Sequence, residues 1–193
     1  MTPTERSRTR RWTRLEYERL IEKGFLDEDE PIELLDGLLL VKEPQSSSHG
    51  AAVTLVAEAL RVAFGDGWSV RVQCPIALDD RSEPEPDVAV VAGPPRDYVD
   101  AHPRRPALVV EVALSGLRRA RGRKARAYAR NGLDDYWIVN LVDRVLEVHR
   151  EPGRRETAPP RWAYASITTL GAGDVVTPLA APAARIRVAD LLP

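Results

Sequence analysis

Cysteine, histidine and long apolar runs are scarce in this chain of 193 residues. The single cysteine, Cys74, excludes an intrachain disulfide, and three histidines are too few to favour a Cys/His zinc site. No apolar run approaches the length of a membrane span, and the N-terminus lacks the apolar core of a signal peptide. The net charge of −1 creates no global field that would attract a polyanion. We therefore expect a cytoplasmic protein that does not bind membranes, in which any nucleic-acid surface comes from local clustering.

The length and composition suit one globular domain. A hydrophobic fraction of 44% and a charged fraction of 30% are ordinary for such a protein. Residues 1–11 are polar and basic, so we expect a disordered tail there and one domain over residues 12–193. The expected elements run helix, hairpin, helix, several strands, helix, strands. This order favours a mixed α/β fold, in which helices flank a mixed sheet, over a repeating βαβ fold.

Local patterns place these elements along the chain. A capping box formed by Thr13 and Glu16 predicts a first helix, and Asp36-Gly37 predicts the turn of a hairpin. Two longer helices are expected over residues 49–64 and 117–131, each followed by glycine. Strands are expected at 32–35, 38–41, 68–73, 75–78, 86–91, 108–114, 136–141 and 144–150. Residues 151–161 are expected to form a mobile loop or long turn, and the last 30 residues to hold two or three short strands.

Asp87 and Glu111 are the most informative pair, because each belongs to an apolar strand-like run. A carboxylate in a run as apolar as Leu108–Leu114 is costly unless a metal ion or a hydrogen-bonded partner compensates it. If the two runs pair antiparallel, both carboxylates fall at one end of the sheet. Two carboxylates in that position would make a hard-cation site of the Mg²⁺ type. The alternative interpretation is a buried acid paired with an arginine.

Lys124 is the one basic residue centred on the apolar stripe of the helix at 117–131. At 100° per residue it shares a face with Leu117, Ala120, Ala127 and Tyr128. A lysine that points inward favours a carboxylate partner, and Asp87 and Glu111 are the nearest candidates in sequence. In a nuclease it would stabilise charge on the scissile phosphate or orient the attacking water. Alternatively, it extends past a face of small residues to solvent.

The same helix carries six arginines, which are Arg118, Arg119, Arg121, Arg123, Arg126 and Arg130. Such density suits contacts to a phosphate backbone, or it is a solvated face in an arginine-rich chain. The candidate nucleic-acid contacts are Arg118, Arg119, Arg121 and Arg123.

His49 and Glu33 are two further candidates. His49 lies on the stripe of Ala52, Val53, Val56 and Leu60, so it points toward the sheet. It either lines the site or serves as a capping or core histidine. Glu33 lies within an apolar strand and is either a third acid of the site or a solvent-facing residue of an edge strand.

Six short motifs resemble, in order and spacing, those of the Uma2 family. They are Ile32-Glu33-Leu34-Leu35-Asp36-Gly37, Ser48-His49-Gly50, Ser82-Glu83-Pro84-Glu85-Pro86-Asp87-Val88, Val109-Val110-Glu111-Val112, Lys124-Ala125-Arg126-Ala127-Tyr128-Ala129 and Tyr136-Trp137-Ile138-Val139. Uma2 is a large bacterial family assigned to the endonucleases with the restriction-endonuclease-like PD-(D/E)xK fold. The similarity extends from about residue 12 to the C-terminus. It implies a DNA endonuclease that uses Mg²⁺ or Mn²⁺.

The resemblance also implies roles for particular residues. Asp87 and Glu111 would be the two acids of the motif and the metal ligands. Ala113 stands where the motif lysine usually follows the second acid, and Lys124 on the next helix matches the alternative position of that lysine. Glu33 and His49 align with family motif positions, and Gln73 falls where the family often has a glutamine at a strand end.

One departure from the family pattern keeps a second hypothesis open. Members often carry an acid four residues before the helix lysine, and this chain has Ala120 there. A weak or inactive member would act as a module that binds nucleic acid or protein. Action on another phosphodiester, such as RNA, is a third interpretation.

We also expect a homodimer, since closed two-fold dimers are the commonest soluble oligomers. The apolar stretch Val175–Pro193 and the edge of the hairpin at 32–41 are the surfaces expected to need a cover.

Overall fold

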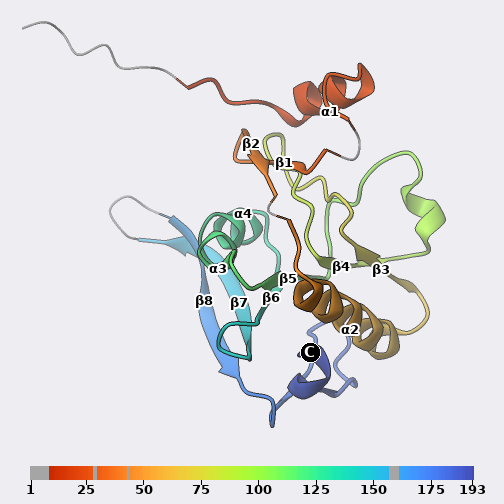
Figure 1. The fold of residues 1–193 in the computed structure, drawn as a ribbon, viewed down its shortest axis with the longest axis vertical. Helices are drawn as coiled ribbons and strands as arrows, with labels where there is room; N and C mark the ends of the chain where they lie inside the picture. Colours follow the sequence, from red (N-terminus) through yellow and green to blue (C-terminus); the bar gives the residue numbers. More distant parts are fainter. Residues whose placement is uncertain (1–8, 28–29, 43, 157–160) are drawn as a thin grey trace, which may run out of the picture.

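The computed structural model describes residues 9–27, 30–42, 44–156 and 161–193, and a six-stranded mixed sheet dominates these ranges (Figure 1). The strand order is β3-β4-β5-β6-β7-β8. The bounds are β3 Trp68–Val72, β4 Val88–Ala92, β5 Leu108–Ala113, β6 Asp135–Asn140, β7 Val145–Arg155 and β8 Arg161–Leu170. Neighbours pair antiparallel except β5 and β6, which are parallel. The mixed α/β fold predicted from the sequence is confirmed.

Helices cover both faces of the sheet. α2 (Ser47–Phe64) packs on one face, against the side chains of Val88, Val110 and Trp137. A helical segment made of α3 (Leu117–Arg119), the π-helical turn η2 (Ala120–Lys124) and α4 (Ala125–Arg130) packs on the other face. This segment also forms the crossover between the parallel strands β5 and β6.

All six residues of β5 are buried, because the strand is covered on both faces. Side chains alternate between the faces of a strand. Val110 and Val112 accordingly face α2, whereas Val109 and Ala113 face α4. Glu111 lies between Val109 and Ala113 and shares their face of the strand, so its carboxylate points to the α4 side.

The N-terminal part begins with α1 (Arg14–Glu22), whose capping box at Thr13 and Glu16 is present as predicted. β1 (Ile32–Leu35) and β2 (Leu38–Val41) form the predicted hairpin. Asp36 and Gly37 both have positive φ, as a tight two-residue hairpin turn requires. Gly37 also leaves no room for a Cβ, because that atom would lie 2.8 Å from Cβ of Arg11. Of the expected basic tail, residues 1–8 lie outside the described residues.

Two local predictions are wrong. Residues 75–78 form no strand, because Gln73 has positive φ and Pro75 follows it, which ends the extended chain after β3. Residues 151–161 are not one loop, since β7 continues to Arg155 and pairs with β8 from Arg161 onward. β6 pairs with β7 only as far as Arg150, so beyond that residue β7 pairs with β8 alone. Pro152, which has no backbone N–H, therefore lies where β7 makes no hydrogen bonds to β6. Residues 157–160 of the expected loop lie outside the described residues.

We expected the C-terminal stretch to be left partly uncovered. In the structure, part of it packs into the core. Its short elements are β9 (Val175–Val176), β10 (Ile186–Arg187) and the 3₁₀ helix η3 (Val188–Leu191). Val188 and Leu191 are fully buried in the cluster that includes α2. One of the two surfaces on which we based the dimer prediction is therefore partly covered within the chain itself, whereas Val175, Leu179 and, on the hairpin, Val41 are exposed. The dimer stays a prediction. In the described ranges, no helix has the length and hydropathy needed to cross a bilayer.

Candidate active site

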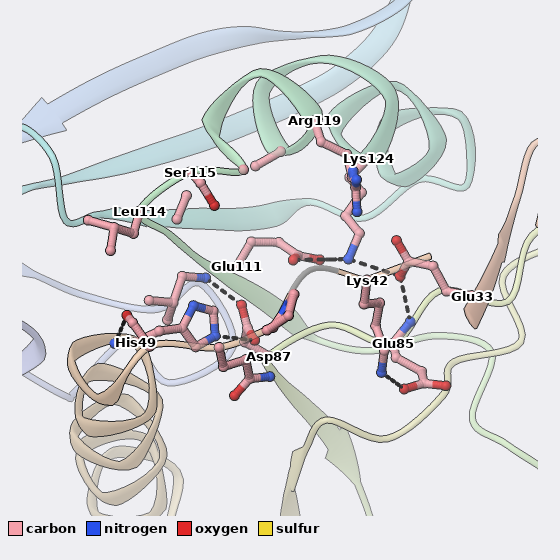
Figure 2. Close-up of a pocket in the computed structure, with 17 residues that line it drawn as sticks. Glu33, Lys42, His49, Glu85, Asp87, Glu111, Leu114, Ser115, Arg119 and Lys124 are labelled. Atoms are coloured by element: carbon pink, nitrogen blue, oxygen red, sulfur yellow. Dashed lines mark hydrogen bonds and ion pairs between the residues drawn. The ribbon is translucent and has the colours of Figure 1, made fainter. Parts of the chain in front are cut away.

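A cavity of about 260 Å³ opens where the start of β4, the C-terminal half of β5, the first turn of α2 and the η2 turn meet (Figure 2). Its lining includes Glu33, His49, Asp87, Glu111 and Lys124. The structure thus brings together, in one cavity, five of the six residues expected to act in or line a site.

Asp87 directly precedes β4 and lies opposite Glu111 when the β4–β5 register is extended by one residue. Asp87 Oδ2 accepts a 2.7 Å hydrogen bond from the Val112 N–H, and Oδ1 lies 2.9 Å from His49 Nε2. Gln73 Nε2 donates to Oδ1 at 3.4 Å from outside the cavity lining. Burial acts to raise the pKa of Asp87, but the hydrogen bonds from His49 and Val112 hold it below its usual value. Asp87 is therefore ionised at neutral pH.

Glu111 extends from β5 toward the helical segment above it. Its two carboxylate oxygens accept hydrogen bonds from Lys124 Nζ at 2.9 and 3.0 Å, and Oε1 also accepts one from the Tyr128 hydroxyl at 2.7 Å. Burial raises the pKa of Glu111 to about 7, and the charges of Asp87 and Glu33 add to this effect against the opposing charge of Lys124. The cavity is therefore short of positive charge.

Lys124 has 6% of its surface exposed and contacts two carboxylates. Its ammonium lies 3.1 Å from Glu33 Oε2 in addition to its two bonds with Glu111. Burial acts to lower the pKa of Lys124, but Glu111 and Glu33 more than offset it, so the pKa lies above its usual value. Lys124 is a permanently charged group at the centre of the cluster, and the expectation that it points toward the sheet is met.

Glu33 is fully buried on β1, which rules out the solvent-facing alternative. Its Oε2 also accepts a 3.2 Å hydrogen bond from the Glu85 N–H. Its Oε1 is buried and has no hydrogen-bond partner among the described residues. An orphaned carboxylate oxygen is costly in a protein interior, so this atom can accept a further donor or cation.

The π-helical turn sets the direction of Lys124. In this turn the Ala125 N–H donates to the Ala120 carbonyl, five residues back, and the Tyr136 hydroxyl donates to the same carbonyl at 3.1 Å. Lys124 ends the turn, and Tyr128 follows it by one regular α-helical turn, so both side chains reach Glu111 from one face. π-turns of this kind occur frequently at functional sites.

The rim of the cavity carries basic groups and a helix start. Lys42 pairs with Glu85, and Arg119 Nη1 donates to the Val41 carbonyl at 3.4 Å. His49 lies in the first turn of α2, where its N–H donates to Ser46 Oγ at 3.3 Å. The hydrogen bond to Asp87 raises the pKa of His49 although burial opposes it. The rim therefore holds one ion pair, Lys42–Glu85, and two further basic side chains, Arg119 and His49.

The four candidate arginines are placed differently from one another. Arg119 lines the cavity, whereas Arg118 and Arg123 do not. Arg121 donates two hydrogen bonds to Glu147, at 2.9 and 2.6 Å, and is engaged there. The sequence analysis missed the hydrogen bond of Tyr128 to Glu111, although the shared stripe with Lys124 was a signal for it. Nothing in the local sequence signalled the pairing of Lys42 with Glu85.

The donor set of the cavity fits a divalent metal ion of the hard type. Within the described ranges, no three Asp, Glu, His or Cys side chains are gathered closely enough to hold a metal ion among them. Mg²⁺ is commonly bound by one or two carboxylates, with water and substrate phosphate as its other ligands. Asp87 and Glu111, which both line the cavity, can supply those carboxylates.

Comparison with known proteins identifies a family and a related fold. Residues 15–189 match the model of the Uma2 family, which is described as "Putative restriction endonuclease". The fold is similar to the crystal structure of a "putative nuclease belonging to DUF820" from Anabaena variabilis ATCC 29413, with a TM-score of 0.68. That match has 15% sequence identity and covers 89% of this chain and 96% of the other. At this identity the match shows a shared fold alone. A comparison with curated proteins gives no match.

Proposed function

The chain belongs to the Uma2 family, and we propose that it is a metal-dependent endonuclease that hydrolyses phosphodiester bonds of DNA. The observation that supports this most strongly is the meeting of Asp87, Glu111 and Lys124 in one open cavity. Each comes from a different element, so their approach is a property of the fold. A carboxylate pair with an adjacent ammonium is the arrangement that phosphodiester hydrolysis needs.

The residues would divide the chemistry among them. Asp87 is held in place by the Val112 N–H and His49, and is kept ionised as a ligand. Glu111 is the second ligand, and the Lys124 ammonium beside it would stabilise the charge that develops on the phosphate. Tyr128 fixes the position of Glu111. When bound, Mg²⁺ or Mn²⁺ would neutralise the phosphate and lower the pKa of a water molecule.

Glu33 would act through Lys124. Its Oε2 lies 3.1 Å from the Lys124 ammonium, so Lys124 is fixed between the carboxylates of Glu33 and Glu111. An ammonium positioned in this way needs no reorganisation when charge develops on the phosphate, which is how preorganised charges lower a barrier.

The proposal is tested by incubating the purified chain with supercoiled plasmid DNA and Mn²⁺. Glu111→Gln and Lys124→Ala variants are assayed beside it, with Glu58→Gln, an exposed change on α2, as the matched control. We expect nicking by the native chain and by Glu58→Gln, and its loss in the other two. Equal nicking by all four proteins would show that a contaminant is responsible.

A second candidate function is a module that binds DNA without cutting it. The hydrogen bonds of both Glu111 oxygens to Lys124 favour this candidate, because a metal ion must compete with the ammonium for them. Ala120, at the position where the family resemblance leads us to expect an acid, points the same way. DNA binding without nicking under any divalent metal would favour this second function.

A further inference from the structure

The six arginines of the α3–η2–α4 segment fall into two electrostatic groups. Arg121 is neutralised by Glu147, and Arg130 lies 2.8 Å from both Asp36 and Asp79. The other four have no carboxylate at ion-pair distance within the described ranges, and they are Arg118, Arg119, Arg123 and Arg126. A buried or paired arginine serves the fold, whereas an unpaired one is available to a ligand.

Three of the unpaired arginines form a row that starts at the candidate active site. The π-helical turn separates Arg119 from Arg123, so the placement of these arginines is taken from the surfaces that they line rather than from α-helical spacing. Arg119 lines the active-site cavity itself (Figure 2). Arg123 lines a second depression, which also contains Asp36, Asp79 and Asp80, and Arg126 lines a third that shares Asp36 and Arg130 with the second.

The row ends at an exposed aromatic side chain on another element. α4 packs beside β8 (Figure 1), and the first two residues of β8 are Arg161 and Trp162. Arg126, Arg161 and Trp162 line a depression of about 420 Å³. Trp162 is 38% exposed, and Arg161 is exposed and has no ion pair among the described residues. An exposed indole beside unpaired guanidinium groups is the combination that binds unpaired bases together with their phosphates.

We propose that this row, Arg119, Arg123, Arg126 and Arg161, binds phosphates of a DNA strand that leaves the active site, and that Trp162 stacks on an unpaired base of that strand. The inference rests on the proposed function, because it takes DNA as the substrate. It makes the preferred substrate a DNA with a single-stranded section beside the cleavage point. It also replaces Arg118 and Arg121, among the arginines suggested by sequence, with Arg126 and Arg161.

The test measures binding separately from cleavage. Fluorescence anisotropy in EDTA follows the full chain with a fluorescein-labelled single strand and with a blunt duplex, between about 50 and 200 mM salt. The double variant Arg123→Ala/Arg126→Ala should bind the single strand at least tenfold more weakly. Its slope of log affinity against log salt should fall by about 1.4, which corresponds to two lost phosphate contacts at about 0.7 each. Arg104→Ala/Arg105→Ala removes two exposed arginines from a distant loop and should bind like the native chain.

Trp162 is tested with Trp162→Ala and Trp162→Phe. The alanine variant should lose about tenfold in affinity for the single strand and little for the blunt duplex, since stacking needs an unpaired base. The phenylalanine variant should keep most of the affinity, and unchanged melting temperatures would show that both variants fold.

Unchanged affinity and salt slope in the arginine double variant would overturn the inference, and native nicking of plasmid would then leave the proposed function standing. Loss of binding in that variant without any nicking by the native chain would reject the nuclease and support only the binding of phosphates by these arginines, as in the second candidate function. A native chain that binds neither DNA would overturn both. An equal loss for single strand and duplex in Trp162→Ala would reject the stacking of a base.

Discussion

Two buried acids on neighbouring strands, Asp135 on β6 and Glu111 on β5, have opposite surroundings. Asp135 is fully buried, and its carboxylate accepts hydrogen bonds from Arg150 Nε at 2.9 Å, Trp137 Nε1 at 2.8 Å and the Leu179 N–H at 2.8 Å. The charge of Asp135 is balanced by Arg150, and both carboxylate oxygens accept hydrogen bonds. Glu111 shares one lysine with Glu33 and lies near Asp87.

The difference separates a structural ion pair from a site that lacks positive charge. A buried pair such as Asp135–Arg150 needs nothing further, and breaking it leaves a charge without compensation. The Glu111 cluster holds three carboxylates around one ammonium, and it opens to the surface through the cavity. The open, undercompensated cluster can take up a cation and a phosphate, whereas the Asp135 pair cannot.

The largest expected effect is on cleavage. Asp87→Asn removes a charged ligand and should lower the nicking rate by at least about a hundredfold, in the range of losses seen when one preorganised charge is removed. Asp135→Asn should leave the rate per folded molecule nearly unchanged. Rates are measured with Mn²⁺ on plasmid DNA and normalised to the folded fraction from circular dichroism. Equal losses in the two variants would mean that the regions do not differ in function.

The next effect concerns stability. Lys124→Ala leaves two buried carboxylates, Glu33 and Glu111, without their common cation, and the free energy of unfolding should fall by about 3–5 kcal/mol at pH 7. Arg150→Ala should cost less, because Trp137 and Leu179 continue to donate to Asp135. Urea denaturation of both variants measures the difference. A Lys124→Ala chain as stable as the native one would contradict the charge assignment of the cluster.

Much of this comparison could be anticipated from the sequence, and some could not. The apolar run around Glu111 and the stripe around Lys124 predict an inward acid and an inward lysine, because period and burial are local properties. The same rules cannot pair Asp135 with Arg150, since those residues meet only when β6 and β7 align. The role of Glu33 depends on where the β1–β2 hairpin docks, which no local pattern specifies. The π-turn is likewise invisible, because a helical wheel assumes a uniform 100° per residue.

Another buried acid, Glu83, should affect the stability of the protein by less than the Lys124→Ala change does. Burial, reinforced by the nearby Glu18, raises the pKa of Glu83 to about 7 against the opposing charge of Arg14. A carboxyl with a raised pKa in the folded state binds its proton more tightly when folded. The protein should therefore lose stability as the pH rises from about 4.5 to about 7.

Glu83→Gln should remove most of that loss and raise the free energy of unfolding at pH 8 by on the order of 2 kcal/mol. The effect should vanish at pH 4, where Glu83 is protonated in both states. Thermal denaturation across this pH range measures it. A variant that is less stable than the native chain at pH 8 would show that Glu83 is stabilised as an anion.

The smallest effect tests the π-turn. Tyr136→Phe removes the hydrogen bond to the Ala120 carbonyl and should cost about 1 kcal/mol of stability. If the turn positions Lys124, kcat for nicking should also fall while KM stays the same, because the substrate contacts remain. Tyr164→Phe is the control, since the Tyr164 hydroxyl is buried without a hydrogen-bond partner in the described residues. An unchanged kcat in Tyr136→Phe would limit that residue to a structural role.

If the Glu111 cluster is a metal site, calorimetric titration with Mn²⁺ at neutral pH should detect the metal without relying on cleavage. We expect saturable binding by the native chain and by Asp135→Asn. It also predicts a rise in melting temperature with metal concentration, as expected when a ligand binds only the folded state. Binding should disappear in Glu111→Gln and Asp87→Asn, although both variants remain folded. A native chain that binds no Mn²⁺, or variants that bind it as well as the native chain, would contradict the account.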